Sequence, residues 1–381
     1  MAYFDNAATT FPKPNIVYDF MCDFYKNSGA NAGRGHYGMA QSAGALIKDT
    51  RERLQKLLHC PAKQVVFTPT ATIALNIIIQ GLIKKGLRNV YISPFEHNAV
   101  TRTLHYFEKK GDIIVSKLHV NQNLAYDLER IRFQFDDIKP ELIIVSHASN
   151  VIGLVAPIEE IFAIAKEYNA YTVADMSQSA GLVDTNVGLN CIDFAVFAGH
   201  KTIYGPTGIS GFVMNPAIVL DPVLFGGTGS ESANQNMPTS LPERYEMGTG
   251  NIAGMAGLNA AIKWIEEQGI ENIWTLEMQH RKRLLDIISR YDFLKIIGYN
   301  DEQKFVGIVS CVMEGISSDS AGAIFDRFGI SVRTGLHCAP LAHQFLDTYP
   351  AGTIRFSVGY FTSDVDFEAL EEALDGIEDS L

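Results

Sequence analysis

Residues 142–175 read LIIVSHASNVIGLVAPIEEIFAIAKEYNAYTVAD, and this stretch decides the fold. Leu142–Ser146 is apolar up to its serine, which is typical of a strand buried on both faces in a parallel sheet. Pro157 then opens a segment in which apolar residues recur at helical spacing as far as Tyr168, and residues 171–174 read as the next strand. A strand, a helix and a second strand in this order predict a parallel α/β unit.

The same alternation continues on both sides of this unit. Four more strand-like runs are predicted, at residues 64–68, 90–93, 194–197 and 209–214. A helix is predicted at residues 72–82, and an amphipathic helix at residues 42–58 with Ser42 as its cap. The sequence therefore predicts an α/β fold with a mostly parallel sheet.

The C-terminal part of the chain has a different pattern. From about residue 251 it becomes helical, and mixed strands are then expected at residues 305–312, 330–332 and 353–358. The last helix, at residues 363–381, starts with Ser363 and Asp366 at the spacing of a capping box. We expect a large α/β domain at residues 16–255 and a smaller α+β domain at residues 256–381, against which the N-terminal segment 1–15 packs.

The composition narrows the possible partners. The chain has 381 residues, of which 43 are acidic and 31 basic, so its formal net charge is −12. This acidic balance argues against nucleic acid or an anionic membrane as a partner, and 47% hydrophobic residues argue against disorder. No targeting or membrane-spanning pattern is found. Five cysteines without a CxxC pair indicate reduced thiols and no metal site, so we expect a cytoplasmic protein.

Three positions could carry chemistry. Asp175 and Lys201 each follow a predicted strand, and Thr72 lies at the start of a predicted helix. Because parallel strands end at one edge of a sheet, the carboxylate and the amine are expected to lie close together. A buried lysine can form a Schiff base, a carboxylate can face a pyridine nitrogen, and a helix start can bind phosphate. Each residue alone is more often a turn or cap residue or a surface side chain, but together they match the needs of pyridoxal phosphate.

At these positions the chain resembles the class V, fold-type I enzymes that use pyridoxal phosphate, and within them the cysteine desulfurase and selenocysteine lyase branch. The resemblance covers nearly the whole chain, and GHKTIYGPTG at residues 199–208 is its most specific stretch. The other matching stretches are FDNAATT (4–10), GRGH (33–36), EHN (96–98), SHASN (146–150), DMSQ (175–178), EMGTGN (246–251), RTGLHCA (333–339) and TIRFS (353–357). The resemblance implies a seven-stranded, mostly parallel sheet between helices.

The resemblance also implies a role for each matching residue. Lys201 would carry the cofactor and move the substrate Cα proton, Asp175 would pair with the ring nitrogen, and His97 would stack on the ring and take part in proton transfer. Gln178 would contact the phenolic oxygen of the ring. Further cofactor contacts would come from Ala71, Thr72, Asn150, His200 and, across a dimer, Thr249. Substrate contacts would come from Arg34, Asn150, Arg333 and Arg355, with Asn150 and Arg355 gripping its carboxylate.

Two positions depart from the family pattern. Ala71 stands where relatives often have a second threonine, and Ala198 where many have a serine. Each substitution removes a hydroxyl donor, which is worth about 0.5–1.5 kcal/mol of net binding. We therefore expect weaker retention of the cofactor phosphate.

Cys338 lies in a short loop beside His337, five residues after Arg333. Positive neighbours would favour its thiolate, and the resemblance places the persulfide-forming nucleophile here. The short segment before Arg355 resembles the branch with a brief, ordered loop that depends on a sulfur acceptor. The ordinary alternative for a lone cysteine is a small buried hydrophobic residue, which we expect of Cys22, Cys60, Cys191 and Cys311.

The expected protein is a homodimeric, pyridoxal-phosphate-dependent cysteine desulfurase. It would convert L-cysteine to L-alanine and pass sulfur, held as a persulfide on Cys338, to an acceptor protein. Three alternatives stay open: a selenocysteine lyase, another class V enzyme such as an aminotransferase or a β-lyase, and a non-catalytic binding protein with the same fold.

Overall fold

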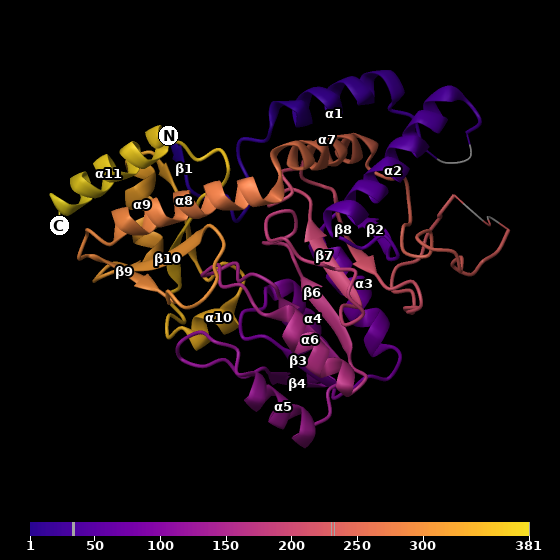
Figure 1. Cartoon of the computed structure of the whole chain (residues 1–381), viewed down its shortest axis with the longest axis horizontal. Helices are drawn as coiled ribbons and strands as arrows, with labels where there is room; N and C mark the ends of the chain where they lie inside the picture. Colours follow the sequence, from indigo (N-terminus) through magenta and orange to yellow (C-terminus); the bar gives the residue numbers. More distant parts are fainter. Residues whose placement is uncertain (33–34, 230, 232, 381) are drawn as a thin grey trace.

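The computed structural model describes residues 1–32, 35–229, 231 and 233–380, and a seven-stranded sheet forms its larger part (Figure 1). Its strands, in spatial order, are β2 (Gln64–Thr68), β8 (Ser210–Met214), β7 (Phe194–Ala198), β6 (Tyr171–Asp175), β5 (Leu142–Ser146), β3 (Asn89–Ile92) and β4 (Ile114–Lys117). β8 runs antiparallel to β2 and β7, and the other neighbouring strands are parallel. The predicted seven-stranded, mostly parallel sheet is therefore confirmed.

Helices cover both faces of this sheet, as strands that are apolar on both faces require. In β5, Leu142 and Ile144 belong to the core that contains α3 (Ala71–Ile83) and α4 (Asn98–Lys109). Ile143 and Val145 belong to the core on the opposite face. The helices of that second core are α2 (Gly38–Leu57), α5 (Leu128–Asp137), α6 (Ile158–Glu167) and α7 (Ile252–Gln268). Against α7 lies α1 (Asn15–Ser28), at the top of Figure 1.

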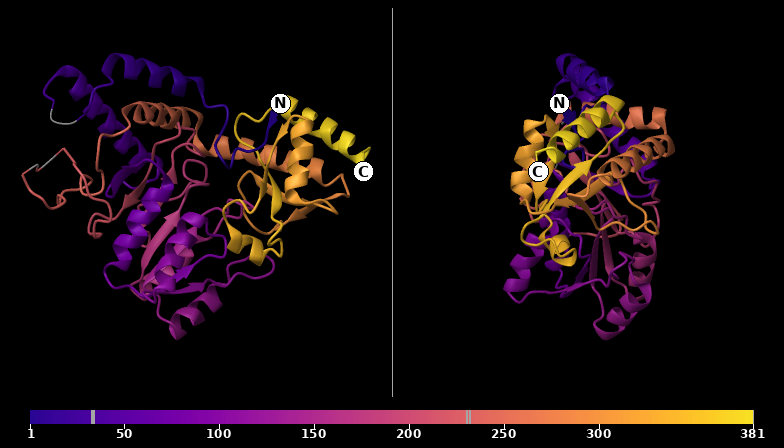
Figure 2. Two further views of the ribbon diagram at one scale, coloured as in Figure 1. Left: turned by 180° about the vertical axis from the view of Figure 1, so that it is seen from behind. Right: turned by 90° about the vertical axis from the view of Figure 1, so that its left-hand side faces the viewer.

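A smaller antiparallel sheet lies beside the large one (Figure 2). Its strands, in spatial order, are β12 (Arg333–Gly335), β13 (Thr353–Ser357), β10 (Ile308–Met313) and β9 (Leu294–Ile297). The helices of this part are α8 (Ile270–Ile288), α9 (Ser318–Arg327), α10 (Pro340–Phe345) and α11 (Asp364–Glu378). The N-terminal strand β1 (Ala2–Tyr3) pairs in parallel with β11 (Ile330–Ser331), so the start of the chain joins this part. The domain boundary at residue 255 stays a prediction.

Some elements differ from the sequence prediction. β4, β9 and β12 were not expected, because the first is a half-exposed edge strand and β12 is only 3 residues long. Ser42 is not a helix cap, because α2 starts a full turn earlier with Tyr37 as its N-cap. Ala40, which belongs to the added turn, is buried, so packing extends the helix beyond the predicted signal. Ser363 and Asp366 do form the predicted capping box.

The arrangement brings the carboxyl ends of β2, β3, β5, β6 and β7 to one edge of the large sheet. The chain segments that leave these strands carry the sequence motifs described above. No helix in the described ranges is long and apolar enough to cross a membrane.

Candidate active site

A cavity of about 270 Å³ lies where these strand ends meet. Most residues predicted to contact the cofactor line it, namely Ala71, Thr72, His97, Asn150, Asp175, Gln178, His200 and Lys201. Ala198, one of the two departures from the family pattern, lines it as well. Strands that are distant in sequence thus supply one continuous group of side chains.

Lys201 and Asp175 provide the opposite charges of this cavity. Burial lowers the pKa of Lys201 to about 8; Asp175 acts against this shift, while Arg355 and Arg333 add to it. Asp175 ends β6, and its Oδ1 accepts hydrogen bonds from the Ser177 amide over 3.0 Å and from the Ser177 hydroxyl over 2.5 Å. Oδ2 has no hydrogen-bond partner in the described ranges, so it is available to a ligand.

His97 is the N-cap of α4 and is neutral at physiological pH. Its Nδ1 accepts a hydrogen bond from the Ala99 amide over 3.0 Å, so the single proton of the neutral ring is on Nε2. Burial lowers the pKa of His97, and Lys201 lowers it further, although Asp175 opposes the shift. His97 can therefore act as a neutral hydrogen-bond donor and present a flat ring to an aromatic ligand.

The first turn of α3 and His200 form the opposite end of the cavity. Thr70 caps this helix by accepting a hydrogen bond from the Ile73 amide, and the first turn holds no acidic residue. The other N–H groups at the helix start have no partners within the helix, which favours an anion. Nδ1 of His200 is buried and has no hydrogen-bond partner in the described part of the chain. Burial, with Lys201 and Lys13 nearby, lowers the pKa of His200 to about 4.

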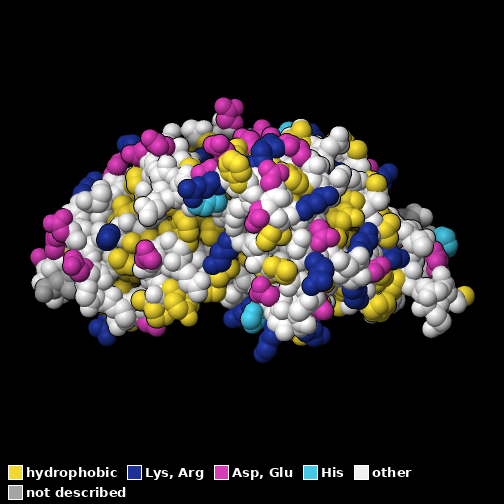
Figure 3. Space-filling model, turned by 90° about the horizontal axis from the view of Figure 1, so that it is seen from below, with side chains coloured by type: hydrophobic (Ala, Val, Ile, Leu, Met, Phe, Trp, Pro, Cys, Tyr) yellow, Lys and Arg dark blue, Asp and Glu magenta, His cyan; other side chains and the backbone are white. Residues whose placement is uncertain are grey.

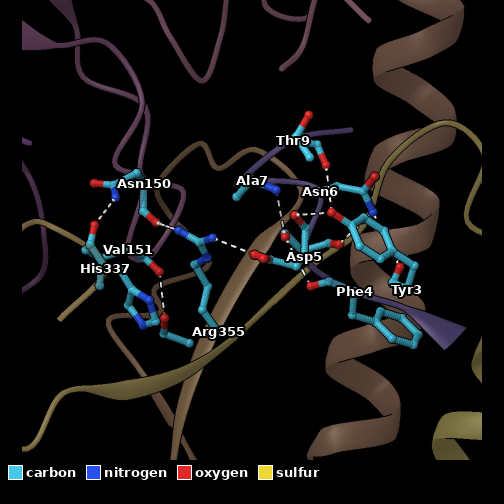
Figure 4. A network of polar contacts seen from close by, with 12 residues as sticks. Tyr3, Phe4, Asp5, Asn6, Ala7, Thr9, Asn150, Val151, His337 and Arg355 are labelled. Atoms are coloured by element: carbon cyan, nitrogen blue, oxygen red, sulfur yellow. Dashed lines mark hydrogen bonds and ion pairs between the residues drawn. The ribbon is translucent and has the colours of Figure 1, made fainter. Parts of the chain in front are cut away.

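A polar network leads from the cavity to the small sheet (Figure 4). Arg355 in β13 is 2% exposed, and its Nη1 donates to the backbone oxygen of Asn150 over 2.9 Å. Its Nη2 donates to Oδ1 of Asp5 over 2.8 Å. Nδ2 of Asn150 donates to the backbone oxygen of His337 over 2.6 Å. Arg355 does not line the cavity itself and is joined to it through Asn150.

Cys338 is exposed, and its loop is held at two points. Asn150 binds the oxygen of His337, and the amide of Asn98, the first residue of α4, donates to the oxygen of Cys338 over 2.6 Å. The backbone of His337 and Cys338 is left-handed, with φ of 46° and 57°. Such angles cost free energy in residues other than glycine and persist where surrounding contacts impose them. The thiol is thus presented on a fixed turn beside the start of α4.

The expectation of a positive His337 beside Cys338 is wrong. His337 is buried, and its Nε2 lies 2.9 Å from the hydroxyl of Thr353. Burial, reinforced by Arg355, holds the pKa of His337 well below its usual range, so the ring is neutral. The cations that interact electrostatically with Cys338 are Lys201 and Arg355. Arg333, exposed on β12, interacts with both of these groups, and its guanidinium has no hydrogen bond or ion pair with another described residue.

Four further expectations have different outcomes. Arg34 lies outside the described residues. Thr249 is exposed and is not among the described residues that line the cavity of its own chain. Gln178 lines the cavity, and its Nε2 donates to the backbone oxygen of Ala7 over 2.9 Å, which leaves it one further N–H. Cys60 and Cys311 are buried as predicted, but Cys191 is half-buried and Cys22 is exposed.

Residues of the N-terminal segment also reach the site, although no role in the site is predicted for them from the sequence. Besides Asp5 on Arg355, the side chain of Lys13 donates to the backbone oxygen of His200 over 2.6 Å. Thr10 donates to the backbone oxygen of Lys201 over 3.1 Å. The motif FDNAATT matches the family pattern, but no local pattern in the sequence shows which distant residues this segment contacts.

The chain matches the family described as Aminotransferase class-V over residues 2–370. The protein belongs to this family. Among the relatives of this class V protein is the "Probable cysteine desulfurase" of Methanothermobacter thermautotrophicus, 31% identical over 383 residues that cover 98% of this chain and 94% of the relative. Another, with the same description, is from Pyrococcus abyssi; it is 31% identical over 389 residues, covering 100% of this chain and 94% of the relative.

Solved structures agree with this membership. The apo structure of cysteine desulfurase from Thermococcus onnurineus NA1 has a TM-score of 0.90 at 29% identity, covering 100% of this chain and 95% of that one. The cysteine desulfurase CsdA from Escherichia coli has a TM-score of 0.85 at 24% identity, with the same coverage, and supports the fold alone. The family resemblance and the fold class expected from the sequence are both confirmed.

Proposed function

We propose that this class V protein is a cysteine desulfurase that uses pyridoxal phosphate, releases L-alanine from L-cysteine and holds the sulfur as a persulfide on Cys338. The observation that carries the proposal is the presence of Lys201 and Asp175 in one cavity, with the Cys338 loop bonded to Asn98 and Asn150 at its border. The relatives named above support the same activity.

The lining residues fit pyridoxal phosphate. Asp175 has an oxygen free for the protonated ring nitrogen, and Lys201 has a lowered pKa that favours Schiff-base formation with its aldehyde. The start of α3 and the unpartnered Nδ1 of His200 suit its phosphate. Thr72 at this helix start and Gln178 beside Ala7 would complete the contacts to phosphate and ring oxygen.

When bound, the cofactor supplies a sink for the electron pair released at the substrate Cα. Lys201 takes the Cα proton, for which an amine with a pKa of about 8 is suited, because a general base works best near the operating pH. Asp175 keeps the ring nitrogen protonated. His97 is neutral and protonated on Nε2, so it would lie against the ring and could donate a hydrogen bond during the proton transfers.

Arg355, Asn150 and Cys338 act on the substrate. The guanidinium of Arg355 and the amide of Asn150 hold the substrate carboxylate. The Cys338 thiolate attacks the substrate sulfur, so that a sulfur–sulfur bond forms as the bond between sulfur and Cβ breaks. The electron pair left on Cβ takes up a proton, and alanine leaves. Lys201 and Arg355 interact electrostatically with Cys338 and would favour its thiolate, and Arg333 and Arg34 are further candidates for lining the pocket.

The test uses purified protein loaded with pyridoxal phosphate, with L-cysteine and L-selenocysteine supplied in parallel, with and without a thiol reductant. A desulfurase makes alanine from L-cysteine and carries protein-bound sulfur that the reductant releases. Alanine from L-selenocysteine alone indicates a selenocysteine lyase. A reaction that stops after one turnover and restarts with a keto acid indicates an aminotransferase. A colourless protein that cannot be loaded indicates a binding protein.

The proposed assembly is a homodimer with an acceptor protein for the sulfur. Thr249 is exposed away from the cavity of its own chain, which supports a contribution to the phosphate end of the partner's cavity. The exposed position of Cys338 supports direct transfer of sulfur to a second protein.

A further inference from the structure

The buried guanidinium of Arg355 is held on two sides, as Figure 4 shows. Nη1 donates to Asn150 over 2.9 Å and Nη2 to Asp5 over 2.8 Å. Nε is buried and has no hydrogen-bond partner in the described ranges. Buried donors are nearly always paired, so each exception calls for an explanation. Nη1 and Nη2 fix the orientation of the guanidinium, and Nε has no acceptor in the described part of the chain. The guanidinium is therefore oriented for an acceptor that a ligand would supply.

Asp5 reaches Arg355 because the N-terminal segment runs beside β13. Asp5 forms a parallel bridge with Ser357, which lies two residues after Arg355 and therefore on the same face of the strand. The Ala7 amide donates to the Ser357 hydroxyl over 2.8 Å, and Nδ2 of Asn6 donates to the Ser357 oxygen over 3.0 Å. These bonds do not involve the Asp5 side chain, so the segment keeps its place when that side chain is changed.

We propose that Asp5 is a positioning residue: its carboxylate fixes the guanidinium of Arg355 so that the remaining N–H groups meet the carboxylate of the amino-acid substrate. This inference rests on the proposed function, in which Arg355 binds that carboxylate. It adds a residue that touches no substrate atom and acts through Arg355.

The physical reason is preorganisation. A free arginine side chain has many rotamers and loses that freedom when it binds a carboxylate. In the Asp5–Arg355 ion pair the two side chains are 21% and 3% exposed, so this freedom is lost on folding, before the substrate arrives. Burial lowers the pKa of Arg355, and Asp5 opposes this effect, so the same carboxylate also favours the charged guanidinium.

The test compares ligands that differ only in the carboxylate. L-Cysteine and cysteamine (2-aminoethanethiol) are one such pair, and L-alanine and ethylamine are another. The holoenzymes of wild type, Asp5→Ala and Asp5→Asn are assayed with the first pair, and the absorbance change of the bound cofactor gives dissociation constants for the second pair. Asp364→Ala, which removes the α11 partner of Arg283 on α8, is the control for loss of an ion pair.

For Asp5→Ala we expect the KM for L-cysteine and the dissociation constant for L-alanine to rise about 10- to 100-fold, the range for losing a hydrogen bond to a charged group. Values for cysteamine and ethylamine should not change, and kcat for L-cysteine should fall much less than KM rises. Asp5→Asn should recover part of the affinity, because its amide oxygen can still accept from Nη2. The control should match wild type with all four ligands.

Two results would overturn the inference. One is an unchanged L-alanine dissociation constant in Asp5→Ala; the other is an equal loss for ligands with and without the carboxylate, which a merely structural role would give. Failure of the proposed function is seen separately, because L-alanine binding needs no sulfur chemistry. If wild type makes no alanine from L-cysteine while Asp5→Ala still loses L-alanine affinity, the role of Asp5 stands and the desulfurase proposal falls.

Discussion

At the scale of single residues, the amine of Lys201 loses its proton within a pH range in which the protein can be assayed. Burial lowers its pKa from 10.5 to about 8. The amine is protonated below that pH and neutral above it, and only the neutral form attacks an aldehyde. We therefore expect the rate of cofactor loading into the apo protein to rise as pH increases through about 8 and then to level off. Absorbance during loading measures this rate, and Lys201→Ala is the control that forms no covalent bond. A rate independent of pH would contradict the expectation.

Cys338 separates cofactor binding from sulfur transfer. The thiol is exposed on a turn held by backbone contacts, so replacing it by serine should leave the cavity intact. For Cys338→Ser we expect the cofactor absorbance of wild type but no protein-bound sulfur after incubation with L-cysteine. Mass spectrometry of the protein and an alanine assay check both points. Cys22→Ser, at the other exposed cysteine described, is the control. Full desulfurase activity in Cys338→Ser would refute the assignment.

Glu277 is a buried carboxyl outside the site, and it makes stability depend on pH. Its Oε1 accepts from the Gly307 amide over 3.1 Å, and burial raises its pKa to about 8 from 4.5. Between these values the folded protein keeps the proton and the unfolded chain loses it, so this group's contribution to stability falls as pH rises. We expect Glu277→Gln to exceed wild type in unfolding free energy at pH 8, and the difference to vanish near pH 4.5. Denaturant unfolding at several pH values tests this, and a difference independent of pH would contradict it.

At the scale of elements, the first position of α3 lacks a hydroxyl that could add to the phosphate contacts. Ala71 is the first residue of this helix and lines the cavity beside Thr72. We expect Ala71→Thr to lower the dissociation constant for pyridoxal phosphate about 2- to 10-fold, because one added hydrogen bond is worth about 0.5–1.5 kcal/mol. Equilibrium dialysis of the apo protein measures it, with Ala217→Thr, an exposed position, as the control. An unchanged affinity would show that this position does not face the phosphate.

The elements that the sequence predicted well are those with a strong local pattern. The β5, α6 and β6 unit combines two buried apolar strands with a helix of clear periodicity, and α11 has its capping box. β12 has no such pattern, because three residues become a strand only by pairing with β13. The same distinction holds for the site. The residues that line the cavity belong to local motifs and could be named from the sequence, whereas the contact of Asp5 with Arg355 could not. That pair depends on two segments that meet only in the folded chain.

At the scale of the whole molecule, the proposed dimer can be tested by mixing inactive variants. If Thr249 completes the cavity of the partner, a mixed dimer of Lys201→Ala and Thr249→Ala has one cavity with both defects and one without any. We expect each variant alone to be impaired, and dissociation and reassociation of the two together to restore activity. The same treatment of each variant alone is the control. Mass spectrometry shows whether mixed dimers have formed. If they have formed and activity is still not restored, a shared site is contradicted.

The face seen from below in Figure 3 carries charges of both signs. Acidic and basic side chains both occur across the face shown in Figure 3, and no continuous basic field covers this face. This distribution and the net charge of −12 suit a protein that does not depend on nucleic acid.

The bridge between the N-terminal segment and β13 has a consequence for biosynthesis. Ala7 and its hydrogen-bond partner Ser357 are 350 residues apart. At ribosomal speed, the first residues wait on the order of 20–70 seconds for their partner strand to be made. During that time Phe4, fully buried in the finished protein, faces water or a chaperone. A nascent chain therefore cannot form the pair of Asp5 and Arg355 until translation is almost over.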